Sequence, residues 1–197
     1  MHKANKRNMQ DPDYYKTEIR RLILETGREG TDHVLDWLET SGFYEVAASV
    51  RFHNNFAHGL AKHSLETCQE ALRLREETKD YAPELIEQLS LDSVVLCSLL
   101  HDVCKTDVYY FDSKGRVKSR HTCQMKGHGQ RSVRILRELG LRLTDDEEMA
   151  VWWHMGKFEV SRPLYPEEFE RALTIPLCRL IQQADSNAAK MAQSDDS

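Results

Sequence analysis

Apolar side chains recur every three or four residues through most of this chain, a spacing that is typical of amphipathic helices. The pattern predicts helices over about residues 14–26, 31–42, 60–75, 83–89, 90–103, 128–140, 144–152 and 175–191. Ser90 and a capping box from Thr144 to Glu147 mark two of the helix starts. A hairpin is expected at residues 108–119, turning through Asp112-Ser-Lys-Gly115. The pattern therefore predicts an all-α fold with one small β-hairpin.

The length of 197 residues corresponds to one domain. We expect a flexible N-terminus at residues 1–12, a single domain at residues 13–192 and a disordered tail at residues 193–197. Hydrophobic residues make up 40% and charged residues 30% of the chain, the balance of a soluble globular protein. The net charge of -5 gives no sign of an extended nucleic-acid surface. No stretch approaches the ~20 apolar residues that a membrane span needs.

The number and spacing of the cysteines indicate the redox environment of the protein. The five cysteines are an odd number and include no Cys-x-x-Cys pair. Cys68, Cys97 and Cys104 fall inside apolar helical patterns, where a free cysteine acts as a small hydrophobic side chain. We therefore expect a reducing environment, and the cytoplasm is the simplest one.

The most informative local sequence is Leu-Leu-His-Asp-Val-Cys-Lys at residues 99–105. Burying an ionisable pair such as His101–Asp102 at the end of an apolar helix costs several kcal/mol unless the pair is compensated. An imidazole nitrogen beside a carboxylate oxygen suits a divalent metal. The alternative is an ordinary helix C-terminus, where His101 or Lys105 meets the negative end of the helix dipole. The two interpretations are about equally supported by this segment alone.

Four further residues add to the pair: His63, His128, His154 and Asp185. Each has a simple structural explanation when taken alone. His128 fits a surface histidine at a helix start, His154 fits a core histidine with one hydrogen bond, and Asp185 fits a solvated carboxylate on a helix.

Together, the order His63 … His101-Asp102 … His128 … His154 … Asp185 resembles the HD superfamily of metal-dependent phosphohydrolases. The resemblance covers about residues 47–190. Leu-Leu-His-Asp-x-x-Lys is similar to the usual second motif, Gly-His-Gly with Ser132 to the third, Trp-His-Met-Gly to the fourth and Ala-Asp to the last. Where stand-alone members have Gly-Gly-Leu before the first ligand, this chain has His58. We interpret His58 as a tolerated surface change, the alternative being an additional pocket group.

The resemblance implies an all-α HD-domain helical bundle that gathers these residues. It implies that His63, His101, Asp102 and Asp185 bind a first metal, and that His128 and His154 hold a second one with Asp102 as the bridge. Imidazole, carboxylate and water ligands favour one or two divalent ions from the set Fe, Mn, Ni, Co and Zn, with Mg admitted.

The resemblance also implies an activity, the cleavage of a phosphomonoester or phosphodiester by metal-activated water. We expect a small-molecule substrate, a nucleotide, with Asp102 and Lys105 as catalytic residues and Arg51 and His53 in contact with substrate. Lys126 and Lys157 flank the third and fourth motifs and are further candidates for phosphate contact. The resemblance is compatible with a homodimer, since many small HD proteins pair as dimers, but the sequence alone does not determine the oligomeric state.

Two other functions stay open from the sequence. One is a non-catalytic metal-binding HD module that acts as a nucleotide sensor or interaction protein. The other is a purely structural helical bundle without metal. Relatives with histidine at both of the later positions include cyclic-dinucleotide phosphodiesterases and an exoribonuclease-type module. The Gly-Tyr-Pro signature of the former is absent here.

Overall fold

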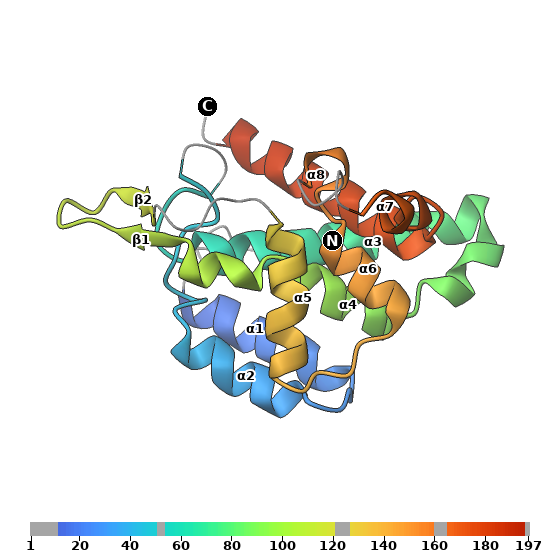
Figure 1. Cartoon of the computed structure of the whole chain (residues 1–197), viewed down its shortest axis with the longest axis horizontal. Helices are drawn as coiled ribbons and strands as arrows, with labels where there is room; N and C mark the ends of the chain where they lie inside the picture. Colours follow the sequence, from blue (N-terminus) through green and yellow to red (C-terminus); the bar gives the residue numbers. More distant parts are fainter. Residues whose placement is uncertain (1–11, 51–53, 121–126, 160–164, 196–197) are drawn as a thin grey trace, which may run out of the picture.

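Helix α3 (Gly59–Tyr81) lies at the centre of the bundle. In the computed structural model, which describes residues 12–50, 54–120, 127–159 and 165–195, α3 packs most extensively against α8 (Pro176–Asp195) and α4 (Leu91–Leu100). Figure 1 shows α8 along one side of α3, with α1 (Pro12–Glu25) and α2 (Thr31–Thr40) on the other. These contacts bury an almost continuous apolar core between the helices.

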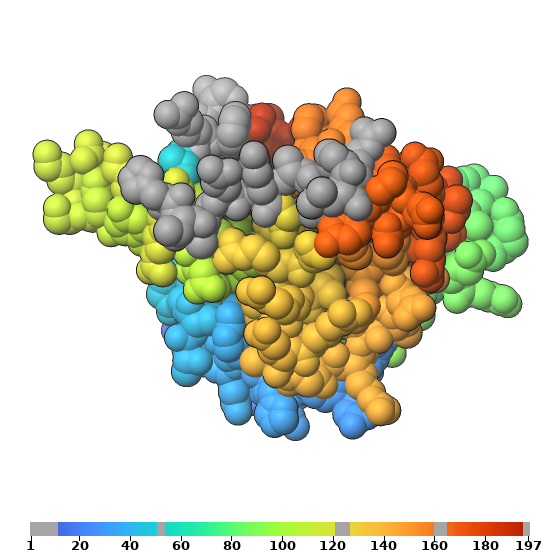
Figure 2. Space-filling model, viewed as in Figure 1, coloured from blue at the N-terminus to red at the C-terminus, as the bar shows by residue number. Residues whose placement is uncertain are grey.

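The remaining elements surround this centre. They are η2 (Pro83–Gln88), η3 (Val103–Asp107), β1 (Tyr109–Phe111), β2 (Val117–Ser119), α5 (His128–Glu138), α6 (Asp145–Trp152), η4 (Gly156–Phe158) and α7 (Pro166–Ala172). The η elements are short 3-10 helices. The hairpin projects at one end of the molecule and η2 at the other (Figure 1, Figure 2). The expected all-α bundle with one small hairpin is confirmed.

Helix α4 shows how the sequence produces the central element. Ser90 Oγ accepts a hydrogen bond from the Ser93 backbone N–H at 3.1 Å and so caps the helix start, as expected. From Val94 to Leu100 every side chain is buried, which explains why apolar residues occupy nearly every position. The helix stops at Leu100, and His101 and Asp102 follow immediately at its buried end.

A partly buried ion pair fixes α6 to the N-terminal half of the bundle. The predicted capping box is present, with Thr144 and Glu147 each bonded to the other's backbone N–H. Glu147 is fully buried and also accepts two hydrogen bonds from the Arg28 guanidinium, at 2.7 and 2.8 Å. Burial raises the pKa of Glu147, but its hydrogen bonds to Arg28 and Ser93 lower the pKa by more, so the net shift is downward. Glu147, which completes the cap at the start of α6, therefore also fixes the position of this helix against Arg28.

Several boundaries differ from those expected. Helix α3 runs six residues past Arg75 to Tyr81, where ion pairs such as Lys79–Glu76 take over from the apolar pattern. Helix α8 continues to Asp195, so the expected start of a tail at residue 193 falls inside the helix. Helix α7 was not predicted from the sequence; Pro166 is its first residue, where the missing N–H has no helical partner to lose.

The predicted hairpin is present, and the cysteines that the structure describes are buried, as their apolar surroundings in the sequence indicate. Strands β1 and β2 pair antiparallel, with Tyr109 opposite Ser119 and Phe111 opposite Val117. The cysteines within the described residues, at positions 68, 97, 104 and 178, are buried and free. Within the same residues, no helix combines the length and apolar character needed to cross a membrane.

Candidate metal centre

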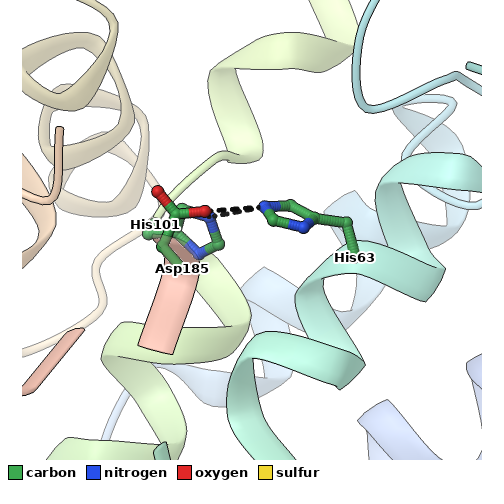
Figure 3. Close-up of side chains that lie close together, drawn as sticks. All are labelled: His63, His101 and Asp185. Carbon is green, nitrogen blue, oxygen red and sulfur yellow. Dashed lines mark hydrogen bonds and ion pairs between the residues drawn. The ribbon is translucent and has the colours of Figure 1, made fainter. Parts of the chain in front are cut away.

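Three helices bring a histidine pair and a carboxylate into contact. His63 comes from α3, His101 follows α4, and Asp185 comes from α8 (Figure 3). The Nε2 atom of His63 lies 3.0 Å from Asp185 Oδ1 and 3.3 Å from His101 Nε2. Both histidines are fully buried, and the Asp185 side chain is 14% exposed. The three groups therefore point at a common centre from which nearly all solvent is excluded.

Asp102 joins this centre from the end of α4. Its Oδ2 atom lies 3.2 Å from His101 Nε2 and 3.7 Å from His63 Nε2, and it accepts a hydrogen bond from Lys105 Nζ at 2.5 Å. Burial raises the pKa of Asp102, but the charges of Lys105 and His101 lower it more, so the pKa lies well below its ordinary value. Asp102 is therefore ionised in the buried centre.

The other oxygen of Asp102 faces a second histidine pair. Its Oδ1 atom lies 3.4 Å from His128 Nε2 and 3.4 Å from His154 Nε2, and these two nitrogens are 3.0 Å apart. This buried oxygen accepts no hydrogen bond from any described residue. One carboxylate thus lies between two histidine pairs, with one oxygen toward each.

Backbone hydrogen bonds set the tautomers of two of these rings. The Nδ1 atom of His101 lies 2.8 Å from the Ser98 carbonyl, and the Nδ1 atom of His154 lies 2.7 Å from the Val151 carbonyl. A carbonyl can only accept, so each Nδ1 carries a proton and donates it. In the neutral rings the Nε2 lone pairs then point at the shared carboxylate. This orientation is the usual one for histidines that ligate a metal.

Such lone pairs repel carboxylate oxygens unless a cation lies between them. For ligand bonds of about 2.1 Å, neighbouring ligand atoms around one ion lie roughly 3.0–3.4 Å apart. The separations around His101 Nε2, 3.2 Å to Asp102 and 3.3 Å to His63, fall in this range. The residues present therefore fit a divalent ion in geometry and in donor type, and the orphaned Asp102 oxygen provides a further position for one.

The electrostatics of the centre agree with this. Burial lowers the pKa of His154, and the neighbouring rings of His101 and His128 add to the effect, so its neutral form is favoured. Burial also lowers the pKa of His101, but Asp102 raises it more, and the net shift is upward. The protonated form of His101 is therefore favoured beside the buried carboxylates, where a divalent ion would supply the same positive charge.

Comparison with known families decides between the alternatives for these motifs. The HD-domain family model matches residues 60–190, about two-thirds of the chain. The chain belongs to the HD family. HD domains bind divalent metals, and the superfamily is one of metal-dependent phosphohydrolases. Searches of curated proteins and of solved structures give no match to this chain.

A cavity leads to the metal centre of this HD domain. It has a volume of about 720 Å³, and Asp102, Lys105, His128, His154 and Asp185 lie at its polar part. The rest of its wall is largely apolar and comes from the turn after His154, from α7, from α8 and from the loop before α3: Ala48, Met155, Gly156, Phe158, Phe169, Leu173 and Ala189. The centre is thus closed to bulk solvent on the α3 side and reachable from this cavity.

The structure brings together all six residues of the histidine–aspartate series and places Lys105 beside them. The surface alternative for His128 does not hold, because its side chain is only 2% exposed and its Nε2 atom faces Asp102. His154 is a buried histidine with a backbone hydrogen bond, as its alternative has it, and its other ring nitrogen lies 3.4 Å from Asp102 Oδ1. Arg51, His53 and Lys126 lie outside the described residues. Lys157 does line the cavity.

His58 has a structural role outside the cavity wall. It precedes α3 in the left-handed conformation, with φ 69°, and its Nδ1 atom lies 2.6 Å from the Tyr44 carbonyl. It is half-buried and is not among the residues that line the cavity. His58 therefore ties the loop after α2 to the start of α3, and it is neither a pocket group nor a simple surface residue.

Sequence reasoning missed part of the cavity wall. Gln182 and Ser186 line it from α8, at spacings of three and one from Asp185. The helical period alone would have placed Gln182 and Ala189 on the same face as Asp185. Phe158, Phe169, Leu173 and Tyr109 have no such signal, because they reach the cavity from separate elements whose packing is not readable from local patterns.

Gly129 allows the two later histidines to approach each other. A Cβ atom on Gly129 would lie 2.0 Å from the Trp152 carbonyl oxygen, so only glycine lets α5 pack this closely on the end of α6. We expect Gly129→Ala to separate His128 from His154, to lower the melting temperature by roughly 2–10 °C and to weaken metal binding at this pair. Thermal denaturation and metal titration check this. Gln130→Ala, at the next and exposed position, is the control. A Gly129→Ala protein with the melting temperature and metal affinity of the wild type would show that this close packing does not require glycine.

Proposed function

We propose that this HD protein hydrolyses a phosphate ester of a small molecule, a nucleotide, at a metal centre built on Asp102. The observation that carries the proposal is that one buried, ionised carboxylate lies between the pairs His63–His101 and His128–His154, at the end of an open cavity. A purely structural role would not need four imidazoles around a carboxylate, because burying these groups costs free energy.

Two groups of residues would hold the metal ions. His63, His101, Asp102 and Asp185 would hold a first ion, and His128 and His154 would hold a second with Asp102 between them. A bound divalent metal supplies a nucleophile at neutral pH by acidifying water, and it polarises the phosphoryl group. The Ser98 and Val151 carbonyls orient the rings of His101 and His154 and hold the proton of each neutral ring on Nδ1, which leaves Nε2 as the atom that would bind a metal.

Lys105 adds a fixed positive charge where the phosphoryl group would lie. Burial lowers the pKa of Lys105, but Asp102, Tyr109 and Asp185 together raise it more, so the net shift is upward and the ammonium group stays charged. Lys105 lines the cavity while its Nζ atom donates to Asp102 Oδ2. It therefore holds the Asp102 carboxylate in place and faces the developing negative charge on the phosphoryl oxygens.

The cavity favours a small substrate. Its volume of about 720 Å³ lies within the range of small-molecule sites and suits one nucleotide. The polar part provides for a phosphate and the apolar wall for the rest of the molecule. A non-catalytic sensor would use the same cavity, so the two functions differ only in turnover.

Turnover is tested by a hydrolysis panel. The purified protein is loaded with Mn²⁺, Fe²⁺, Co²⁺, Ni²⁺ or Zn²⁺ and assayed on nucleoside monophosphates, cyclic nucleotides and short dinucleotides, with a chelator-treated sample as control. The proposal predicts metal-dependent release of phosphate or nucleotide from at least one class. Binding of these compounds without hydrolysis under any metal would support the sensor instead.

A further inference from the structure

The wall of the cavity contains an aromatic side chain whose exposure the fold does not explain. Phe158 is 70% exposed, although it is a large apolar residue, and it lines the cavity that holds Asp102 and Lys105. Leu173, 41% exposed, lines the same cavity. Large apolar surface left open beside a concave polar site is typical of a ligand contact.

The position of Phe158 is set by the same turn that places His154. Gly156 adopts φ 53° two residues after His154, and its N–H donates to the Trp153 carbonyl at 2.8 Å. The Gln182 side chain donates to the same carbonyl at 2.9 Å, which fixes the turn to α8. The Phe158 N–H then donates to the Met155 carbonyl at 3.0 Å and closes η4. The aromatic ring is therefore presented from an anchored turn that begins at a residue of the metal centre.

A cation accompanies the ring. Lys157 Nζ lies 5.2 Å from the centroid of the Phe158 ring, within the range of a cation–π contact. Lys157 also lines the cavity. A planar heteroaromatic ring stacks on an exposed phenyl ring, and a neighbouring ammonium group can pair with ring carbonyl or nitrogen acceptors. A sugar or polyol phosphate has no planar π system and can offer this ring only C–H contacts.

We infer that the planar ring of the substrate stacks on Phe158, beside Lys157. This contact makes Phe158 a specificity-determining residue, which favours nucleotides over phosphate esters without a ring. The inference rests on the proposed function for the position of the phosphate. It goes further by naming the side chain that reads the remainder of the substrate. Phe158 binds through its face and takes no part in bond cleavage.

Non-hydrolysable probes test this inference separately from turnover. Adenosine 5′-methylenephosphonate carries a ring and methylphosphonate does not, and neither has an ester bond to cleave. We measure both by calorimetry on the Mn²⁺-loaded protein and compare wild type with Phe158→Ala. The account predicts that the wild type binds the adenosine probe more tightly. Phe158→Ala should weaken that binding by about tenfold, the size of a single stacking contact, and leave methylphosphonate unchanged.

Two more variants complete the design. Phe158→Trp keeps a stacking surface and should retain the tight binding of the adenosine probe. Tyr81→Ala removes an aromatic side chain that is 75% exposed on α3 and is not among the residues of the cavity wall, and it should change neither probe. Melting curves confirm that each variant is folded, as expected for such exposed positions.

The outcomes separate the inference from the proposed function. Equal affinity of the wild type for the two probes, or an unchanged adenosine affinity in Phe158→Ala, would overturn the inference and leave the hydrolytic proposal standing. Loss of ring binding in Phe158→Ala, in a protein that cleaves no ester of the panel, would support the inference and reject hydrolysis. If the wild type binds neither probe, the inference is wrong.

Discussion

Replacing Asp102 by Asn should reduce metal-stimulated hydrolysis by about 10³-fold or more, the size of effect expected when a central electrostatic group is removed. Asn has nearly the same shape as Asp but lacks its charge. Asp102 contacts all four imidazoles of the centre and accepts a hydrogen bond from Lys105. The substitution therefore removes the shared ligand while leaving the surrounding side chains in place.

The matched control for Asp102→Asn is Asp107→Asn. Asp107 is exposed, lies at the end of η3 and precedes the hairpin, five residues from Asp102. It should keep wild-type activity and metal content. Steady-state hydrolysis of the best substrate of the panel measures both variants. A normal rate in folded Asp102→Asn protein would show that the reaction does not depend on this centre.

Replacing His128 and His154 together by Ala should remove about one metal ion per chain and leave the ion at His63, His101 and Asp185. The two rings face only one oxygen of Asp102, and that oxygen has no other partner among the described residues. The first group of ligands retains its contacts, including the 3.0 Å separation of His63 and Asp185. We expect hydrolysis to fall by at least about 100-fold, because loss of metal-site partners commonly costs that much.

Elemental analysis by mass spectrometry measures the metal content of this double variant. His33→Ala is its control, because His33 is exposed on α2, away from the metal centre, where its Nδ1 atom lies 3.2 Å from the Leu139 carbonyl. A double variant with the same metal content as the wild type would mean that the centre holds one ion, with His128 and His154 serving another purpose. A double variant without any metal would mean that the two pairs form a single site.

The helices could be predicted from the sequence where apolar spacing alone forms them. The buried run of α4 and its Ser90 cap are both local features, and so is the capping box at Thr144. Local patterns failed where another cause extends an element. The last turns of α3 bury polar side chains, Arg75 and Thr78, so no apolar period marks them. Helix α7 is short, and its buried Phe169 packs on Trp153 at the end of α6.

The candidate site was predictable as a set of residues but not as a geometry. The motif order suggested which imidazoles and carboxylates belong together. It did not show that the two oxygens of Asp102 face separate histidine pairs, because that depends on how α5 packs on α6 at Gly129. The apolar wall was also invisible, since Phe158 and Leu173 approach from elements that have no shared sequence pattern.

The most direct test of the metal centre is the stoichiometry of metal in the purified wild-type protein. The protein is stripped with a chelator, reloaded separately with Mn²⁺, Fe²⁺, Co²⁺, Ni²⁺ and Zn²⁺, desalted and analysed by mass spectrometry beside Asp102→Asn. We expect one or two ions per wild-type chain for at least one of these metals, with a large loss in the variant. A wild-type protein that retains none of them, or an Asp102→Asn protein that retains the full wild-type amount, would contradict this expectation.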